Sequence, residues 1–204
     1  MPLSLLSDDL PDDGSPTLGP GRDAAWLERI RAGDAGAFET LFRDHYHGLC
    51  VFAARLVASD AIAEELVQDV LLRVWQQRER WTVTGTVAAY LYGAVRNQAL
   101  AYLRHARVER RWQDRKAAES RHTLEGHVAL ADEAIRGAEL AAAIDRAITD
   151  LPPRCREAYL LRRQHHLSYA EIAGVMNVTP KTVEIHIGAA LKALRASLAE
   201  WLAT

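Results

Sequence analysis

Residues 167–194 read LSYAEIAGVMNVTPKTVEIHIGAALKAL. Ser168 and Glu171 form the S-x-x-E pattern of a capping box, which predicts the start of a helix. Asn177 tolerates the left-handed backbone of a tight turn, and Thr179 followed by a proline is typical of the start of a second helix. Two helices joined by a turn of a few residues predict a helix-turn-helix.

The second of these helices has a face suited to DNA. On a helical projection this face lies opposite the apolar side formed by Val183, Ile187 and Leu191. A helix in this position usually enters the major groove of DNA. There, cationic side chains bind phosphates, a carboxylate accepts a hydrogen bond from the cytosine amino group, and an apolar side chain contacts the thymine methyl group. A hairpin that binds protein or merely packs is the alternative. The candidate DNA-binding residues are Lys181, Thr182, Glu184, Ile185 and His186.

Composition limits the class of protein. The chain has 204 residues, of which 49% are hydrophobic, and this predicts one or two folded domains. A net charge of −2 means that any nucleic-acid contact comes from local basic patches. Cys50 and Cys155 form no CxxC pair, which favours free thiols in a reducing cytosol. No apolar run or signal pattern points to membrane insertion, so we expect a soluble cytoplasmic protein.

The N-terminal half has a helical pattern throughout. Residues 1–21 are acidic and contain prolines and glycines, which predicts a mobile tail. A short helix over 26–32 is followed by a helix that Asp34 caps, and an amphipathic run over 49–57 predicts a third, separate helix. No stretch alternates with period two between turn signals, so a sheet is not expected.

Residues 61–78, AIAEELVQDVLLRVWQQR, are apolar on more than one side. Ile62, Leu66 and Val70 belong to the side that we expect to face a core. The opposite side mixes apolar and acidic residues; it is either buried within a helical bundle or offered to a partner protein. The candidate interface residues are Glu64, Gln68, Asp69 and Leu72.

Residues 81–86, WTVTGT, predict a loop before a long helix over 87–112, with Thr86 as the helix cap. Arginines gather on the outer side of this helix, next to aromatic residues. Such a surface suits a single strand of nucleic acid, because bases stack on aromatic rings while arginines follow the phosphates. An ordinary solvated face is the alternative. The candidate single-strand-binding residues are Trp81, Tyr90, Arg96, Asn97 and Arg104.

Residues 117–138 combine two glycines with scattered charge and little periodicity, which predicts a linker. The chain then divides into the tail over 1–21, a helical domain over 22–116, the linker, and a second helical domain over 139–204 that contains the helix-turn-helix. The expected fold class is therefore all-α, with two small domains.

Four motifs follow one another between residues 24 and 198: AGDAGAFETLF, AEELVQDVLLRVW, YLYGAVRNQALAYLR and LPPRCREAYLLRRQHHLSYAEIAGVMNVTPKTVEIHI. Together they resemble bacterial RNA polymerase sigma factors, specifically the small extracytoplasmic-function (ECF) group of the sigma-70 family. The resemblance implies two helical domains, regions 2 and 4, joined by a flexible linker. It also implies that captured, unstacked bases open the promoter through binding energy, without covalent chemistry.

The resemblance gives each candidate surface a role. The face with Gln68, Asp69 and Leu72 would dock on the β′ clamp helices of core polymerase, and the β flap is a further expected contact. The loop over 81–86 and the helix after it would capture the melted minus-10 strand. The exposed face of the recognition helix would read the minus-35 element. Promoter DNA, core polymerase and an anti-sigma factor are thus the expected partners.

Other classes fit the sequence less well. A LuxR or response-regulator type of transcriptional regulator has a similar helix-turn-helix, but its receiver domain needs strands that this sequence does not predict. A helical adaptor that binds only protein is the second alternative. No glycine-rich phosphate loop or nucleophile–base pair predicts an enzyme, and no cofactor is expected. His45, His47, His165 and His166 lack partners at ligand spacing, so no metal site is expected.

Overall fold

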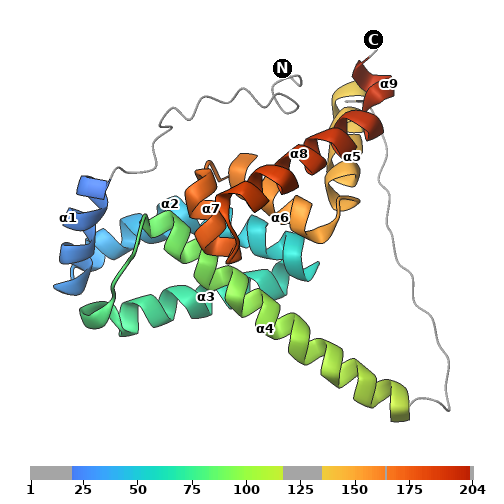
Figure 1. The fold of residues 1–204 in the computed structure, drawn as a ribbon. Coiled ribbons are helices and arrows are strands. Elements are labelled where there is room, and N and C mark those ends of the chain that lie inside the picture. Colours follow the sequence, from blue (N-terminus) through green and yellow to red (C-terminus); the bar gives the residue numbers. More distant parts are fainter. Residues whose placement is uncertain (1–19, 117–134, 164, 203–204) are drawn as a thin grey trace.

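The computed structural model describes residues 20–116, 135–163 and 165–202. Every regular element in these ranges is a helix, which confirms the all-α prediction (Figure 1). The expected tail and the expected linker lie almost entirely outside the described residues. None of the helices in the described part of the chain combines the length and the apolarity needed to cross a membrane.

The N-terminal domain is built around three helices that lie side by side. Its core is formed by side chains such as Leu49, Phe52, Leu71, Leu91 and Val95, all of which are fully or almost fully buried. Its helices are α1 (Pro20–Arg31), α2 (Ala35–Val57), α3 (Asp60–Gln76) and α4 (Val87–Lys116), with a short 3-10 helix (Arg78–Arg80) after α3.

Side-chain caps fix where these helices begin. The Asp34 carboxylate accepts from the backbone N–H of Ala37 at 3.1 Å, and Thr86 Oγ1 accepts from that of Ala89 at 3.3 Å, as the sequence predicts. The prediction of a separate helix over 49–57 is wrong, because α2 runs without a break from 35 to 57. Leu41 and Leu49 are both fully buried on one face of α2, so the polar segment between them stays helical.

The C-terminal domain contains the predicted helix-turn-helix. Ser168 and Glu171 form both bonds of the capping box at the start of α7. Asn177 has φ 54°, the left-handed turn conformation, and Thr179 Oγ1 caps α8 by accepting from the N–H of Thr182 at 3.2 Å. The helices are α5 (Ile135–Thr149), α6 (Pro153–Arg163), α7 (Tyr169–Met176), α8 (Pro180–Ser197) and α9 (Ala199–Leu202). Helix α5 begins four residues before residue 139, where the sequence places the start of this domain.

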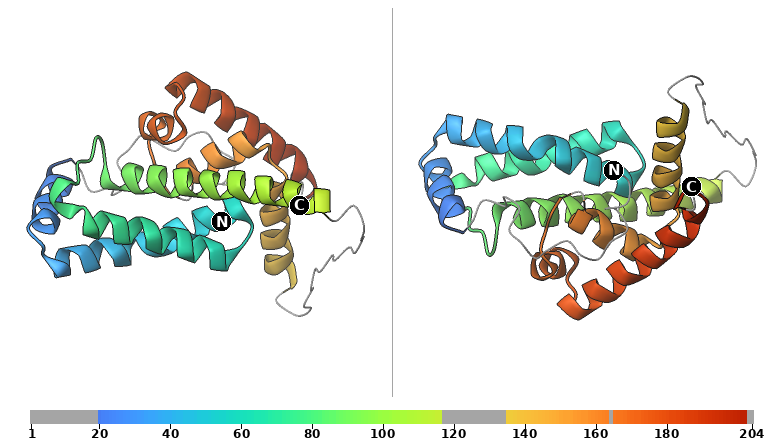
Figure 2. Two further views of the ribbon diagram at one scale, coloured as in Figure 1. Left: turned by 90° about the horizontal axis from the view of Figure 1, so that it is seen from below. Right: turned by 90° about the horizontal axis from the view of Figure 1, so that it is seen from above.

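The two domains are in direct contact. Figure 2 shows α4 between the α2–α3 pair on one side and the C-terminal helices on the other, with α7 packed on α4. The helix that carries the candidate single-strand-binding residues is therefore also the helix that meets the C-terminal domain.

Candidate functional site

The exposed face of α8 presents three of the five predicted DNA-binding residues. Lys181, Glu184 and Ile185 are exposed, and the Ile185 side chain is 61% accessible although it is apolar. The Lys181 ammonium donates to the Glu184 carboxylate at 2.9 Å, so the two charges offset each other on the exposed face of α8. Val183 and Ile187 on the opposite side of α8 are buried, which fixes the orientation of the helix.

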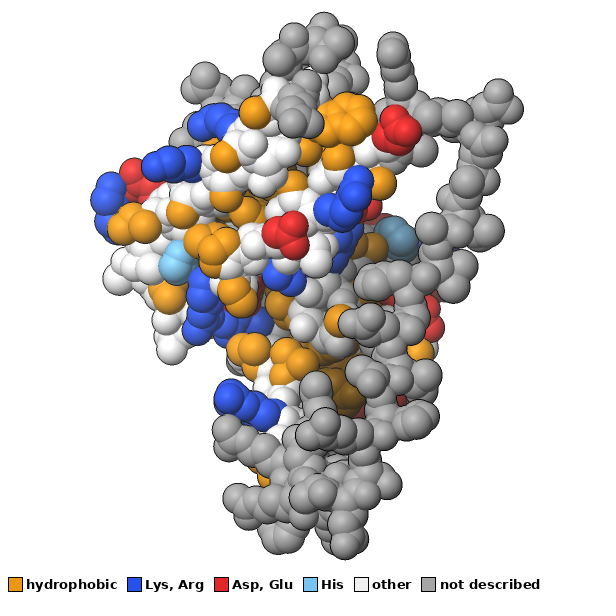
Figure 3. Space-filling view, turned by 90° about the vertical axis from the view of Figure 1, so that its right-hand side faces the viewer, with side chains coloured by type: hydrophobic (Ala, Val, Ile, Leu, Met, Phe, Trp, Pro, Cys, Tyr) orange, Lys and Arg blue, Asp and Glu red, His pale blue; other side chains and the backbone are white. Residues whose placement is uncertain are grey.

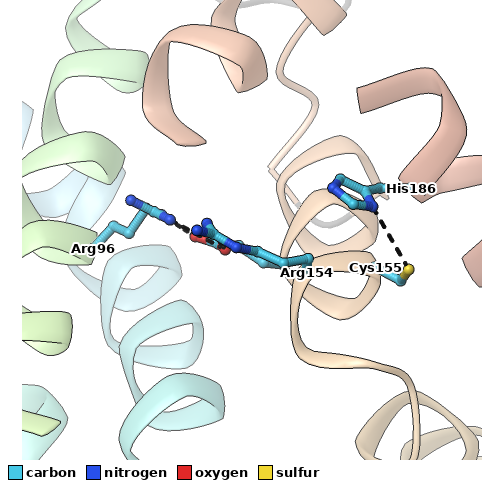
Figure 4. A network of polar contacts seen from close by, with 5 residues as sticks. Arg96, Arg154, Cys155 and His186 are labelled. Carbon is cyan, nitrogen blue, oxygen red and sulfur yellow. Dashed lines mark hydrogen bonds and ion pairs between the residues drawn. The ribbon is translucent and has the colours of Figure 1, made fainter. Parts of the chain in front are cut away.

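The other two predicted residues on α8 are less open. Thr182 Oγ1 shares a hydrogen bond of 2.8 Å with Thr179 Oγ1 at the helix start. His186 turns toward α6, where its Nδ1 lies 3.9 Å from the Sγ of Cys155 (Figure 4). Burial raises the pKa of the Cys155 thiol, so Cys155 is a neutral neighbour of the imidazole. Both residues are half-buried at the edge of the exposed face of α8.

A hollow of about 510 Å³ opens on the N-terminal domain between the end of α3, the 81–86 loop and α4. Tyr90 and Asn97 stand exposed at its wall. Trp81 is only 4% accessible and packs edge to face against Tyr90, with ring centroids 5.6 Å apart. The indole Nε1 of Trp81 is shielded from solvent and has no hydrogen-bond partner in the structure. The hollow thus combines an exposed aromatic ring with an amide, which together suit a nucleobase.

Arg96 differs from its predicted position in an exposed stripe. It is 5% accessible and donates from its guanidinium to Glu157 of α6, which is equally buried (Figure 4). Arg154 adds a second, longer contact of 3.5 Å to the same carboxylate. Arg104 and Arg107 remain exposed on α4. In this arrangement Arg96 is not available to DNA, because a carboxylate from the other domain neutralises it.

Figure 3 shows how charge is distributed over one face of the molecule, where Lys and Arg side chains lie among apolar ones. The chain as a whole carries a net charge of −2. Basic character is therefore local, as nucleic-acid binding by a near-neutral protein requires.

The predicted protein interface lies on α3. Glu64, Gln68, Asp69 and Leu72 are all exposed, and Leu72 is 52% accessible. Gln68 Nε2 donates to the hydroxyl of Tyr46 on α2 at 3.2 Å. Tyr46 stacks on Phe42, which is 38% accessible, with ring centroids 4.5 Å apart.

The candidate interface residues predicted from the sequence include neither Phe42 nor Tyr46. The structure adds both to the surface around Leu72. The width of the apolar arc on α2 is the signal that could have identified them, because other residues already fill the core side of this helix. The buried residues of α2 are Ala37, Leu41, Leu49, Phe52, Ala53 and Val57.

No group of three or more His, Cys, Asp or Glu side chains in the described ranges is arranged to hold a metal ion. Cys50 and Cys155 are free thiols.

The sequence profile of sigma-70 region 2 matches residues 41–109, and that of sigma-70 region 4 matches residues 141–194. The chain is 28% identical over 182 residues to the RNA polymerase sigma-H factor of Pseudomonas aeruginosa, covering 87% of this chain and 94% of that protein. It is 29% identical over 174 residues to the RNA polymerase sigma factor CarQ of Myxococcus xanthus, covering 85% and 96%. It is also 26% identical over 176 residues to the ECF RNA polymerase sigma-E factor of Escherichia coli K12, covering 84% and 92%.

Solved structures share the fold. CnrH in complex with the cytosolic domain of CnrY superposes with a TM-score of 0.60 at 21% identity, covering 87% of this chain and 97% of that one. The sigma factor RpoE in complex with the anti-sigma factor NepR from Bartonella quintana gives 0.57 at 21% identity, covering 79% and 96%. With regions 2 and 4 matched in order and relatives covered over nearly their whole length, the chain belongs to the ECF group of the sigma-70 family of RNA polymerase sigma factors.

Proposed function

We propose that this chain directs core RNA polymerase to specific promoters and assists promoter opening. The observation that carries the proposal is the pair of matched regions, region 2 followed by region 4, on a chain of the ECF sigma type. The chain works where the polymerase works, in the cytoplasm, and regulates initiation without a catalytic step of its own.

The recognition helix α8 is the proposed reader of the minus-35 element. Lys181 sits at the amino end of the helix, where it reaches a phosphate or a guanine edge, and Glu184 one turn later accepts from a cytosine amino group. The exposed Ile185 suits a thymine methyl group. Thr182 and His186 lie at the edge of this face and act as supporting contacts.

The hollow beside the 81–86 loop is the proposed site for a base of the melted minus-10 strand. Its volume of about 510 Å³ lies within the range of small-ligand pockets, which is about 300–1,000 Å³. Tyr90 offers a ring for stacking and Asn97 an amide for base edges, while the buried Trp81 ring packs edge to face against Tyr90. Each stacked base is worth about 1–3 kcal/mol. Base capture of this strength offsets the cost of unstacking the duplex.

The surface around Leu72 is the proposed contact for the β′ clamp helices, with Glu64, Gln68 and Asp69 at its polar rim. An apolar centre surrounded by polar groups is the usual layout of a protein interface. The β flap and an anti-sigma factor complete the proposed set of partners. One solved structure with the same fold is CnrH in complex with the cytosolic domain of CnrY, and another is the sigma factor RpoE in complex with the anti-sigma factor NepR.

Transcription from promoter fragments by sigma-free core polymerase, with and without the purified chain, tests the proposal. We expect promoter-specific transcripts that depend on the chain. If the chain instead binds duplex promoters tightly without core and never binds core, it is a helix-turn-helix regulator of another kind.

Separate Lys181→Ala and Glu184→Ala substitutions test the assignment of α8. We expect each to weaken transcription from the preferred promoter by about 5–150-fold, the range of one base contact worth about 1–3 kcal/mol, while core binding is unchanged. Asp150→Asn, which changes an exposed carboxylate of the same domain away from α8, is the control. Equal weakening on every promoter sequence would mean that these side chains contact only phosphates.

A further inference from the structure

The two charged residues at the start of α8 contact each other on its exposed face. The Lys181 ammonium lies 2.9 Å from the Glu184 carboxylate, and the two side chains are 74% and 55% accessible. An exposed ion pair of this kind, between residues three apart on a helix, contributes little to stability. Stability therefore does not explain why the pair lies on the proposed DNA-reading helix.

The order of the two charges is also not the order that the helix itself favours. Lys181 directly follows Pro180, the first residue of α8, and Thr179 is the N-cap. The amino end of a helix carries a positive partial charge, so an acidic side chain stabilises it and a lysine does not. Helix stability would favour the two charges in the reverse order. A role in recognition explains the observed order better than a role in stability does.

The first turn of α8 holds the pair in a fixed direction. Thr179 Oγ1 accepts from the backbone N–H of Thr182 at 3.2 Å and shares a hydrogen bond of 2.8 Å with the Thr182 hydroxyl. On the opposite side of the helix, Val183 and Ile187 are fully or almost fully buried. The backbone that carries the two charged side chains is thus anchored on both sides in the free chain.

A G·C base pair presents a matching set of groups in the major groove. Guanine offers the acceptors O6 and N7, and cytosine offers the donor N4. O6 and N4 are joined by a hydrogen bond of the base pair, so they lie about 2.9 Å apart. The ammonium of Lys181 and the carboxylate of Glu184 have the same separation. The ammonium can therefore donate to guanine O6 or N7 while the carboxylate accepts from the free hydrogen of cytosine N4.

The other base pairs match this set less well, when each is written with the base that faces Lys181 first. C·G and A·T place an amino group against the ammonium and a carbonyl oxygen against the carboxylate. T·A keeps the favourable order, because thymine O4 is an acceptor and adenine N6 is a donor. Thymine has no second acceptor beside O4, however, and adenine N7 adds an acceptor on the side of the carboxylate. G·C is therefore the best match.

We propose that Lys181 and Glu184 together read one G·C base pair of the minus-35 element in a single orientation, with guanine on the side of Lys181. We call this the shared readout. It rests on the proposed function, because it takes α8 to lie in the major groove of the minus-35 element. It adds the identity of the base pair, the order of its strands and the fact that both residues contact the same pair.

The shared readout keeps the ion pair intact on DNA. A carboxylate that enters the groove alone is repelled by the phosphates, and the adjacent ammonium offsets that charge. Loss of the lysine leaves the carboxylate unpaired among phosphates, whereas loss of the glutamate leaves a cation there. Lys181→Ala should therefore weaken transcription from the preferred promoter more than Glu184→Ala does.

Exchange of the two charges in one protein, Lys181→Glu with Glu184→Lys, tests the shared readout. The exchanged residues can form the same ion pair in the order that suits the helix dipole, so we expect α8 to fold normally. Transcription by the reconstituted holoenzyme is measured on a promoter library with a randomised minus-35 element and a transcribed barcode for each variant. We expect the unsubstituted chain to prefer G·C over C·G at one position by about 5–150-fold, and the exchanged chain to prefer C·G at that position.

The single variants give a second measurement on the same library, which decides the matter even if the exchanged chain is inactive. Lys181→Ala and Glu184→Ala should both abolish the preference at that one position and leave the preferences at other positions unchanged. Loss of preference at two different positions, or at none, would overturn the shared readout. An exchanged chain that transcribes but still prefers G·C would overturn it as well.

The Glu39–Arg43 pair of α2 provides a matched control. Its charged atoms are 2.6 Å apart and both side chains are exposed, so Glu39→Arg with Arg43→Glu is the same kind of exchange in the other domain. We expect the base preferences of this variant to equal those of the unsubstituted chain. If the unsubstituted chain gives no promoter-specific transcripts with core, the proposed function fails and the shared readout fails with it. If transcription is promoter-specific but its base preferences do not depend on Lys181 or Glu184, the shared readout alone fails.

Discussion

Leu72 and Ile185 are single apolar side chains that expose more than half of their surface, 52% and 61% respectively. A lone exposed apolar residue is ordinary on a soluble protein. These two are distinctive in position. Leu72 lies one helical turn after Gln68, which donates to Tyr46 of the exposed Phe42–Tyr46 stack, and Ile185 directly follows Glu184 of the Lys181–Glu184 pair. Each of these two side chains is therefore available for an apolar contact and is surrounded by polar groups.

Leu72→Asp should weaken binding of the chain to core polymerase by about tenfold or more, because a buried apolar contact at an interface centre is replaced by an unpaired charge. Since Leu72 is exposed in the free chain, the free energy of unfolding should change by no more than about 0.5 kcal/mol. Titration of labelled core measures the first effect and urea unfolding the second. Val108→Asp, at a similarly exposed apolar residue on α4, is the control; equal loss of core binding in both variants would contradict the assignment.

At the scale of the helices, local chemistry predicted most of the fold. The caps at Asp34, Thr86 and Thr179 act within three residues of the side chain, so they can be identified in the sequence. The same local reasoning divided α2 in two, because it gave the polar segment between Leu41 and Leu49 too much weight.

The candidate functional site could be predicted from the sequence only in part, because some of its contacts are not local. The exposure of Lys181 and Glu184 follows from helical period alone. The burial of Arg96 depends on Glu157, which lies 61 residues further along the chain on another domain. Neither periodicity nor motif spacing carries information about a partner that distant, so the stripe of arginines was expected to be open.

Helix α7 provides a prediction at this scale. Ser168 Oγ accepts from the N–H of Glu171 at 3.3 Å, and the Ser168 N–H donates to the Glu171 carboxylate at 2.8 Å. Ser168→Ala should lower the free energy of unfolding by about 1 kcal/mol, the usual effect of losing a helix cap. Urea unfolding of the full chain measures it, and Ser168→Thr should retain most of the stability. If Ser168→Ala unfolds like the unsubstituted protein, the capping box does not stabilise α7.

At the scale of the whole molecule, the domain contact is sensitive to pH through His165. Burial, with a smaller contribution from the charge of His166, lowers the pKa of His165 from 6.5 to about 4. Burial also raises the pKa of the Tyr92 hydroxyl, so this group on α4 stays a neutral donor to the imidazole. From α2, the imidazole faces Gly48 and the Phe52 ring.

Because the domain contact buries the neutral imidazole, the contribution of His165 to this contact is complete above about pH 6.5 and is lost as the pH falls toward about 4. The ratio of chains with the domains in contact to chains with the domains apart should fall by up to about tenfold per pH unit in that window. Scattering at about pH 7.5 and about pH 5.5 measures the expansion, and His165→Asn should abolish its dependence on pH in that range. The same dependence in His165→Asn would assign the effect to other groups.

The pairing of Arg96 with Glu157 joins two parts of a single chain, so the concentration of the protein affects this contact differently from its binding to core polymerase. An intramolecular contact has the same occupancy at every dilution, whereas the association with core polymerase is bimolecular. The ratio of core-bound chains to free chains is therefore set by the concentration of free core and not by that of the chain itself. Doubling synthesis of the chain would double both forms without changing their ratio, as long as core is in excess.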